Sequence, residues 1–501
     1  MRIRTRSLII TLSQGLTQAA GLLQGIILVR IITQADLGTF RQTLVAYGIL
    51  AGLLAFQFEN SLLYFIPKMD PRMRRPLLAQ TFLATAVMAV LIACGLFFAA
   101  APIARAMHNP ALVGPLRVMA LYPFVDRMIA IIPPFMVSLD RAARAAAYSL
   151  AAAAGRVTLV IVVFALGGTV TTAVWGAVAG VSAVALIGGV DMLRLSGPGA
   201  FRLDRGLLLE QWSYTWPLWA TALVAVVNVQ FDKLLISLFF TPESFAVYSC
   251  GALEVPIISI VVGSVATATM PNLVLLAERG EKLAALDLWQ EGARKCSLIV
   301  FPVFGFLAFV AADLIVLLYG RDYAMAAWPF ELYLMLLPIR ITVYATLFRA
   351  LGKTGPVLAA QALSLAANVA LSTAITWAGG RTTLGFIGPA LGAVLSQLVG
   401  VIYMLVSLRG LIRVRFAALM RWKELAGLLA LCLLCGALVA AIPLPTLPLL
   451  LKLVVRALVF GAALLAGLLG LNMLKPDEKH LLFLPLRVAR RAWAGVMRPT
   501  S

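Results

Sequence analysis

Long apolar stretches alternate with short polar segments along the chain. About fourteen of these stretches hold roughly 20 residues or more, the length that a helix needs to cross the hydrocarbon core of a bilayer. The pattern therefore predicts an all-α polytopic membrane protein. The predicted spans cover residues 7–32, 43–66, 77–101, 116–139, 145–167, 169–193, 212–240, 246–275, 296–319, 324–349, 355–378, 384–408, 424–442 and 450–471.

Most of the predicted spans belong to two copies of one unit. Each copy holds about six spans, and because this number is even, both copies start at the same face of the membrane and are parallel repeats. The Gly-x-x-x-Gly pairs at 176/180 and 388/392 favour close helix packing within each copy. Equivalent positions are 212 residues apart late in each copy (Gly176, Gly180 and Gly188 with Gly388, Gly392 and Gly400) and 208 apart near its start (Thr33, Asp36 and Phe40 with Thr241, Ser244 and Tyr248).

Composition and charge placement agree with a membrane protein. Hydrophobic residues make up 62% of the chain, charged residues 12%, and the mean hydropathy is +0.98, which is more apolar sequence than a soluble core can bury. The formal charge of +20 comes from Lys and Arg that concentrate in alternate loops, among them 68–75, 194–205, 279–295 and 409–423. This asymmetry follows the positive-inside rule, so we expect both termini in the cytoplasm and no nucleic-acid partner.

Sequence signatures of enzymes and metal sites are missing. The Gly-Lys-Thr string at 352–354 lacks the first glycine of a Walker A loop, because Leu347 stands at that position. Cys432 and Cys435 have C-x-x-C spacing but lie in an apolar helix without a His or an acid nearby. The longest stretch between predicted spans is about 20 residues, too short for a catalytic domain. We therefore expect a protein that is not an enzyme and that carries no cofactor or metal.

Three short motifs resemble those of a known family. They are the hairpin at 29–40 (VRIITQADLGTF), the runs at 230–236 (QFDKLLI) and 246–248 (AVY), and the segment 349–354 (RALGKT). At these residues the chain resembles the polysaccharide or oligosaccharide flippases of the multidrug, oligosaccharidyl-lipid and polysaccharide exporter superfamily. The resemblance spans about residues 7–410 and consists of the pattern of spans plus these short motifs.

The resemblance implies a V-shaped pair of six-helix lobes, at 1–195 and 205–410. An additional pair of spans at 424–471 and a basic amphipathic cytoplasmic tail at 472–501 follow them. The resemblance also implies a flippase that moves an undecaprenyl-diphosphate-linked oligosaccharide from the inner to the outer leaflet of the bacterial inner membrane. Such an activity serves the synthesis of O-antigen, exopolysaccharide or capsule. The implied partners are this lipid-linked oligosaccharide, membrane lipids, a polysaccharide polymerase and a chain-length regulator.

Charged residues inside predicted spans are the main candidates for function, because each costs about 2.5–3.5 kcal/mol at a helix centre. Arg127 and Arg340 lie 213 residues apart and are nearly equivalent in the two copies. Two guanidinium groups at similar depth favour bidentate binding of a lipid diphosphate from both sides. Arg156, near the middle of its span, is the third candidate ligand. In the alternative interpretation, Arg127 pairs with Asp126 inside its own lobe.

Other intramembrane charges are candidates for ion coupling or gating. Lys233 and Glu254 lie on adjacent spans at a matched depth of roughly 10–12 Å, so we expect them to pair. That pair is either structural or part of a gate. Asp232, next to Lys233, and the acids Glu59 and Asp126 complete this group.

A stripe of small or polar residues runs down the span at 212–240. After Pro217, these residues follow one another in three- and four-residue steps, which places them on one helix face. A polar face on a membrane helix is typical of a cavity wall, so Asn228 joins the candidates for substrate binding. The stripe consists of Thr221, Ala225, Asn228 and Asp232.

Three other classes of protein compete with a flippase. A cation-coupled multidrug exporter of the same superfamily fits the repeat, but its bacterial members are expected to carry an acid in the first span, and 7–32 has none. A major-facilitator carrier also has two six-span halves, but the loop 68–75 lacks the G-x-x-x-D-[RK] signature. A polysaccharide polymerase or ligase needs a large outer loop, whereas the outer loops here hold roughly 4 to 14 residues.

The loop charges predict which loops face the cytoplasm. A single cysteine introduced between residues 279 and 295 should resist a membrane-impermeant maleimide added to intact cells, because this basic loop lies inside. The same residue should react after the cells are permeabilised. Labelling of the intact cells would contradict the predicted topology.

Overall fold

The computed structural model describes residues 3–253, 255–444 and 447–475. These residues form helices joined by short loops, without a strand among them, which confirms the predicted all-α fold. The helices of the first half are α1 (Ile3–Ile31), α2 (Gln34–Leu54), α3 (Phe58–Phe65), α4 (Arg74–Phe98), α5 (Ala100–Ala106), α6 (Val113–Met119), α7 (Tyr122–Ser138), α8 (Ala142–Ala165) and α9 (Val170–Leu195).

The second half follows with one long helix and then a series of shorter and longer ones. Its helices are α10 (Arg205–Phe239), α11 (Pro242–Gly251), α12 (Pro256–Glu278), α13 (Lys282–Tyr319), α14 (Ala327–Leu334), α15 (Leu336–Ile339), α16 (Ala345–Ala350), α17 (Gly355–Gly379) and α18 (Thr383–Ile412). Two more helices come last, α19 (Trp422–Ala440) and α20 (Leu449–Gly470).

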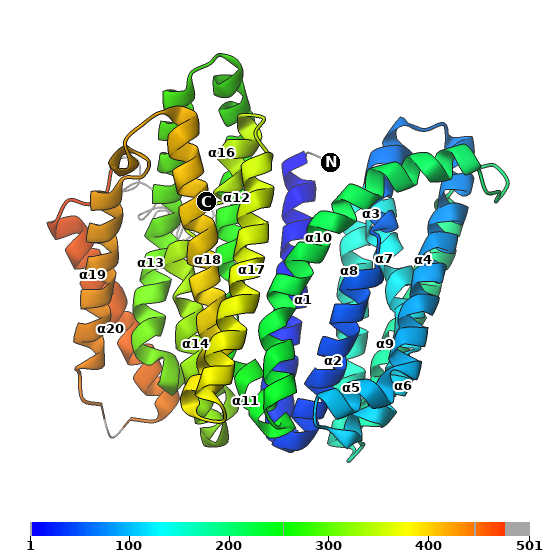
Figure 1. Cartoon of the computed structure of the whole chain (residues 1–501), viewed down its shortest axis with the longest axis horizontal. Helices are drawn as coiled ribbons and strands as arrows, with labels where there is room; N and C mark the ends of the chain where they lie inside the picture. Colours follow the sequence, from blue (N-terminus) through cyan, green and yellow to red (C-terminus); the bar gives the residue numbers. More distant parts are fainter. Residues whose placement is uncertain (1–2, 254, 445–446, 476–501) are drawn as a thin grey trace, which may run out of the picture.

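The helices gather into two bundles that lie side by side. Figure 1 shows α2 to α9 on one side and α11 to α20 on the other, with α1 and α10 between them. We call these bundles the N lobe and the C lobe. The packing repeats: α1 lies against α8 and α8 against α9, while the equivalent α10 lies against α17 and α17 against α18. The long helix α10 also contacts α2, α3 and α4, so it crosses from one lobe to the other.

Not every predicted span is one continuous helix. Among the described residues, twelve helices are long and apolar enough to cross a membrane, or thirteen if a pair bent by 47° (Pro110–Met119 and Tyr122–Ser138) counts as one span. The predicted span at 43–66 breaks between α2 and α3, where Gln57 takes a left-handed conformation with φ of 54°. The segment predicted at 324–349 is divided into the short helices α14, α15 and α16, and Pro338 lies next to one of these breaks. Apolar length alone does not reveal such breaks.

Corresponding glycines bring helices together inside each lobe, as the repeat predicted. A Cβ on Gly180 would lie 2.3 Å from the carbonyl oxygen of Gly155, so α9 and α8 touch through their backbones. In the C lobe, a Cβ on Gly392 would lie 2.2 Å from Ser372 Oγ and one on Gly388 would lie 2.7 Å from Thr376 Oγ1. The Gly-x-x-x-Gly pairs therefore serve packing between α8 and α9 and between α17 and α18.

The two ends of the molecule differ. One end, at the bottom of Figure 1, carries the turns between α1 and α2 and between α10 and α11, and we call it the hairpin end. The opposite end carries the Lys- and Arg-rich loops around 68–75, 279–282 and 413–421, and we call it the basic end. The lobes meet at the hairpin end, where a Cβ on Gly38 of α2 would lie 2.0 Å from the carbonyl oxygen of Pro242 in α11.

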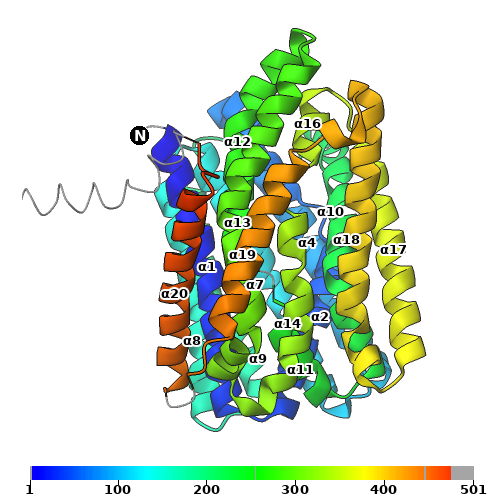
Figure 2. The same cartoon turned by 90° about the vertical axis from the view of Figure 1, so that its left-hand side faces the viewer.

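Ion pairs attach α19 and α20 to the long helix α13, and Figure 2 faces this side of the molecule. Near the hairpin end, Asp313 of α13 accepts from Lys452 at 2.9 Å and from Arg456 at 2.6 Å. Near the basic end, Arg294 of α13 pairs with Glu424 and Arg421 pairs with Asp287 at 2.6 Å. These pairs fix the extra helices to the C lobe. The predicted tail at 472–501 lies outside the described residues from position 476 on.

Because α8 and α9 approach each other closely at Gly180, even the methyl group of alanine does not fit at this position. Gly180→Ala should lower the melting temperature of the purified protein and its yield from membranes, because the added methyl group forces the helices apart at a cost of about 1–3 kcal/mol. Gly21→Ala is the matched control, since a Cβ there meets no atom within 4 Å. Equal loss of stability in both variants would contradict this packing.

Candidate functional site

Arg127 lies in an ionic cluster inside the N lobe. Its Nη2 donates to Asp126 Oδ2 at 2.6 Å and its Nε to the same oxygen at 3.2 Å. Its Nη1 lies 3.6 Å from Glu59 Oε1, which α3 contributes. The arginine therefore has two carboxylate neighbours from its own lobe. Of the two interpretations of Arg127, this conformation shows the one in which it pairs with Asp126.

Two tyrosines connect this cluster to Arg156. Tyr47 of α2 donates a short hydrogen bond to Asp126, and Arg156 of α8 donates to the hydroxyl of Tyr122 at 3.2 Å. The rings of Tyr47 and Tyr122 pack edge to face with centroids 5.2 Å apart. Three of the predicted residues, Arg127, Asp126 and Arg156, thus belong to one network. The sequence analysis did not identify the two tyrosines, because aromatic residues are common in membrane spans.

A cavity of about 480 Å³ lies between this cluster and α10. Its N-lobe wall contains Arg127, Glu59, Gln57 and Asn60, and its other wall is a face of α10 that is apolar except for Gln230. The break between α2 and α3 brings the polar residues to this wall. Within the wall, Asn60 donates to Gln57 Oε1 at 3.0 Å. Irregular backbone inside a membrane is tolerated where it lines such a cavity. The cavity offers hydrogen-bond donors and acceptors plus a guanidinium group to a polar ligand.

Arg340 lines a different cavity, in the C lobe. This space of about 390 Å³ also has Tyr333, Tyr344 and Gln397 in its wall, and Arg340 Nη2 donates to Gln397 Oε1 at 3.2 Å. The local structure differs from that of its repeat mate, because Arg340 ends the short helix α15 whereas Arg127 lies within α7. The structure does not place Arg127 and Arg340 in one cavity, so the predicted two-arginine clamp is not assembled in this conformation.

The stripe on α10 is divided between two surroundings. Ala225 faces the cavity between the lobes, whereas Asn228 accepts a hydrogen bond from Asn368 Nδ2 of α17 at 2.6 Å. Ser372 in turn donates to Asn368 Oδ1 at 2.8 Å. Asn228 therefore takes part in a polar contact between α10 and α17 in this conformation. An isolated Asn in the apolar sequence of α17 is the signal that points to Asn368.

Asp232 is enclosed in the C lobe and is only 1% exposed. Its Oδ2 accepts from the hydroxyls of Tyr248 on α11, at 3.3 Å, and of Tyr333 on α14. Its Oδ1 is buried without a hydrogen-bond partner among the described residues. A buried carboxylate with a free oxygen is suited to bind a cation or a proton, because its charge is otherwise expensive in low dielectric.

The predicted pair of Lys233 and Glu254 stays a prediction. Glu254 lies outside the described residues. Lys233 is half-buried on α10, and within the described part of the chain it has no hydrogen-bond or ion-pair partner. A lysine in this state keeps its role as a gating or coupling candidate.

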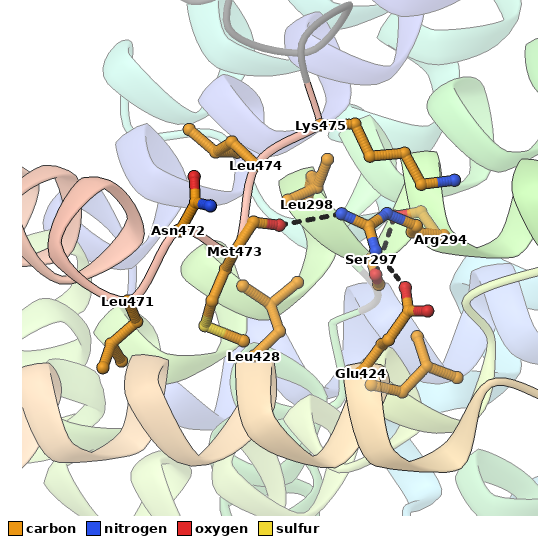
Figure 3. Close-up of a pocket in the computed structure, with 11 residues that line it drawn as sticks. Arg294, Ser297, Leu298, Glu424, Leu428, Leu471, Asn472, Met473, Leu474 and Lys475 are labelled. Atoms are coloured by element: carbon orange, nitrogen blue, oxygen red, sulfur yellow. Dashed lines mark hydrogen bonds and ion pairs between the residues drawn. The ribbon is translucent and has the colours of Figure 1, made fainter.

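A third cavity lies away from both arginines, at the basic end of the C lobe. It has a volume of about 310 Å³ and is lined by α13, α19 and the segment that follows α20. Figure 3 shows Arg294 reaching toward Glu424 and toward the carbonyl oxygen of Met473, to which it donates at 2.8 Å. Lys475 pairs with Glu291 at 2.8 Å. These contacts tie the end of α20 to α13, and we assign the cavity a structural role.

The apolar helices define a multi-pass helical membrane protein with polar cavities inside it. The sequence model of the family described as "Polysaccharide biosynthesis protein" matches residues 4–276, which is more than half of the chain. The chain belongs to this family, and the resemblance noted in the sequence is confirmed.

Solved structures of transporters share the fold. A structure titled "Lipid II flippase MurJ, inward closed conformation" superposes with a TM-score of 0.69 at 12% sequence identity and covers 93% of this chain and 99% of its own. An inward-facing multidrug resistance MATE family transporter of the MOP superfamily has a TM-score of 0.63 at 16% identity, over 79% of this chain and 94% of its own. A comparison with curated protein sequences finds no match. At these identities the likeness establishes the fold alone.

The pairing of Asp126 with Arg127 predicts a specific pattern of stability. Asp126→Asn should lower the amount of protein in membranes, because it leaves the guanidinium with Glu59 alone at 3.6 Å. Breaking a fully buried pair costs about 3–5 kcal/mol in soluble proteins, and this pair, with side chains 25% and 16% exposed, should cost less. Adding Arg127→Gln should restore abundance. A double variant no more abundant than Asp126→Asn would show that the pair does not stabilise the fold.

Proposed function

We propose that the protein is a flippase for an undecaprenyl-diphosphate-linked oligosaccharide. The observation that carries the proposal is the cavity between the N lobe and α10, where Arg127 lies beside the amide side chains of Gln57 and Asn60 and pairs with Glu59 in the same wall. A guanidinium group suits a diphosphate, and amide side chains suit sugar hydroxyl groups. Membership of the polysaccharide biosynthesis family and the fold shared with a lipid II flippase support this choice of substrate.

In this proposal the basic end faces the cytoplasm and the protein resides in the bacterial inner membrane. The positive-inside rule supports this orientation and puts both termini inside. The hairpin end then faces outward, and the contact of Gly38 with Pro242 closes it. The conformation is thus one that receives substrate from the inner leaflet, and alternating access requires the lobes to separate at the hairpin end later. The two parallel repeats would form lobes 1–195 and 205–410, with 424–471 as an accessory pair.

Each predicted residue has a place in this scheme. Arg127 would exchange Asp126 and Glu59 for the diphosphate when substrate enters, so that the two acids lose their partner. Carboxylates released in a membrane cavity take up protons or cations, which would link substrate binding to an ion gradient. Arg156 and Arg340 would contact the ligand in other stages of the cycle. Asn228 would contact the ligand from the C-lobe side, where Asp232, Lys233 and Glu254 would act in coupling or gating.

The product of this reaction would be used on the outer face of the membrane. A polysaccharide polymerase with its chain-length regulator is therefore the expected consumer, and membrane lipids are the expected surroundings. A cation-coupled multidrug exporter is the second candidate. The buried Asp232, with one oxygen free of hydrogen bonds among the described residues, favours ion coupling, and a MATE transporter shares the fold.

Reconstituted protein tests the proposal. Proteoliposomes with wild-type protein should move a fluorescent undecaprenyl-diphosphate-linked oligosaccharide between leaflets, and liposomes without protein should not. Export of cationic dyes without movement of the glycolipid would favour the drug exporter instead.

Substitutions at the arginines separate binding from folding. Arg127→Gln combined with Asp126→Asn should keep normal abundance but lose at least tenfold in glycolipid movement, because the diphosphate loses its guanidinium partner. Arg340→Ala should have the same effect on transport. Lysine at either position should restore only part of the rate, since it lacks the bidentate geometry. Arg105→Ala, an exposed arginine outside the cavities, is the control and should move glycolipid at the wild-type rate.

A further inference from the structure

One arginine of the N lobe reaches into the C lobe at the hairpin end. Arg41 of α2 donates from Nη1 to Ser249 Oγ of α11 at 2.6 Å. The two residues are 208 positions apart, which is the offset of the repeat in this region. A contact between equivalent residues of two parallel copies lies on the axis that relates the copies. Arg41 therefore occupies the centre of the contact between the lobes.

The surroundings of this guanidinium are polar, and it forms no ion pair with an acid among the described residues. It neighbours the Cys250 thiol and the hydroxyl groups of Tyr319 and Tyr323, all three of which are buried residues of the C lobe. On the N-lobe side it lies over Gly25, where a Cβ would come within 3.3 Å of Nη2. A glycine at this point of α1 leaves room for the guanidinium between the lobes.

Each lobe holds its half of the contact firmly. Asn109 donates to Thr39 Oγ1 at 2.9 Å and to Gln42 Oε1 at 2.7 Å, so the start of α2 is fixed to the N lobe on both sides of Arg41. In the C lobe, a Cβ on Gly251 would lie 2.1 Å from the carbonyl oxygen of Ala326, which shows how tightly α11 is packed. Because both halves are rigid, a bond between them opposes movement of one lobe against the other.

Two weaker contacts lie beside Arg41 at the same end. Gln34 Nε2 donates to the carbonyl oxygen of Asp322 at 3.0 Å, and Arg30 Nη2 donates to that of Leu317 in the last turn of α13 at 3.3 Å. Both of these hydrogen bonds are exposed, whereas the bond from Arg41 is partly buried, because Arg41 lies about 10 Å further in, seven residues along α2 from Gln34. Water competes less for a charge-assisted hydrogen bond at that depth.

We infer that Arg41 is the latch that keeps the hairpin end closed. Its partners are neutral dipoles, so breaking the contact leaves no unpaired acid behind in the C lobe. A guanidinium that swings away from Ser249 can meet water as the lobes part. This arrangement holds the closed state while permitting its release in each cycle. The inference rests on the alternating-access part of the proposed function, because a latch matters only if this end opens.

Distances between spin labels on the two lobes test the latch directly. Exposed Arg105 and Arg381 lie at the hairpin end in the N and C lobes, and exposed Arg72 and Lys353 lie at the basic end. Each pair is replaced by cysteine in a full-length chain that keeps the buried Cys250 beside Arg41 and lacks its other four native cysteines. The labelled protein is measured in nanodiscs by pulsed electron paramagnetic resonance. In Arg41→Gln the hairpin-end distance should lengthen and the basic-end distance should shorten relative to wild type.

Two further variants keep the result interpretable. Ser249→Ala removes only the hydroxyl acceptor, so it should fold normally and shift both distances in the same directions by less. Arg321→Gln removes an exposed arginine of the hairpin end that has no hydrogen-bond or ion-pair partner among the described residues, and it should leave both distances unchanged. Wild-type distances in folded Arg41→Gln and Ser249→Ala would overturn the latch.

The outcome is separable from that of the substrate assay. The distance measurement needs no substrate, so shifted distances without glycolipid movement by the wild type would support the latch and contradict the proposed substrate. Glycolipid movement by the wild type together with unshifted distances would support the flippase and contradict the latch.

Discussion

The hydrocarbon of a bilayer offers no hydrogen-bond partners, and this constraint explains where the helices of the protein are allowed to end. Backbone groups freed by a break must be satisfied by protein or by water in a cavity. The break after α2 meets this condition, because Gln57 and its neighbours face the cavity between the lobes. The break at Arg340 meets it in the same way, within the C-lobe cavity. Irregular backbone and polar cavities therefore coincide.

The same constraint governs the charges. Asp313 lies between Lys452 and Arg456, and Arg127 lies between Asp126 and Glu59. The two groups differ in what surrounds them. The first is enclosed by α13 and α20, and Arg456 is 8% exposed, so it holds helices together. The second forms part of a cavity wall, which is where we propose that a ligand exchanges for a carboxylate. Position relative to a cavity, and not charge alone, distinguishes a structural pair from a binding site.

The duplicated unit has diverged where function is expected and has kept its form where packing is required. Thr33 and Thr241 both cap the helix that follows by accepting from the backbone nitrogen three residues on. The glycines of α9 and α18 likewise keep equivalent contacts. By contrast, Arg127 lies in a regular helix and its near-equivalent Arg340 at the end of a short one. Two similar lobes thus present different polar groups in their cavities.

The sequence by itself determined the membrane location of the chain, its all-helical fold and its duplicated architecture. These properties follow from the length of apolar stretches and from residues recurring at a constant offset, both of which are local or periodic signals. The sequence also identified the candidate functional charges, since a charged residue inside a membrane span is energetically costly. The pairing of Asp126 with Arg127 was one of two interpretations that the sequence left open.

Only the tertiary structure decided which of these residues meet. The tyrosines around Asp126 and Asp232 come from other helices, and nothing in the spacing of the chain relates Tyr333 to Asp232 or Asn368 to Asn228. The break at Gln57 was hidden because apolar length does not depend on backbone conformation. Arg41, which falls between the predicted spans 7–32 and 43–66, lies at the contact between the lobes, where it donates to Ser249. Contacts between distant segments depend on how the two lobes pack, and a one-dimensional pattern does not contain that information.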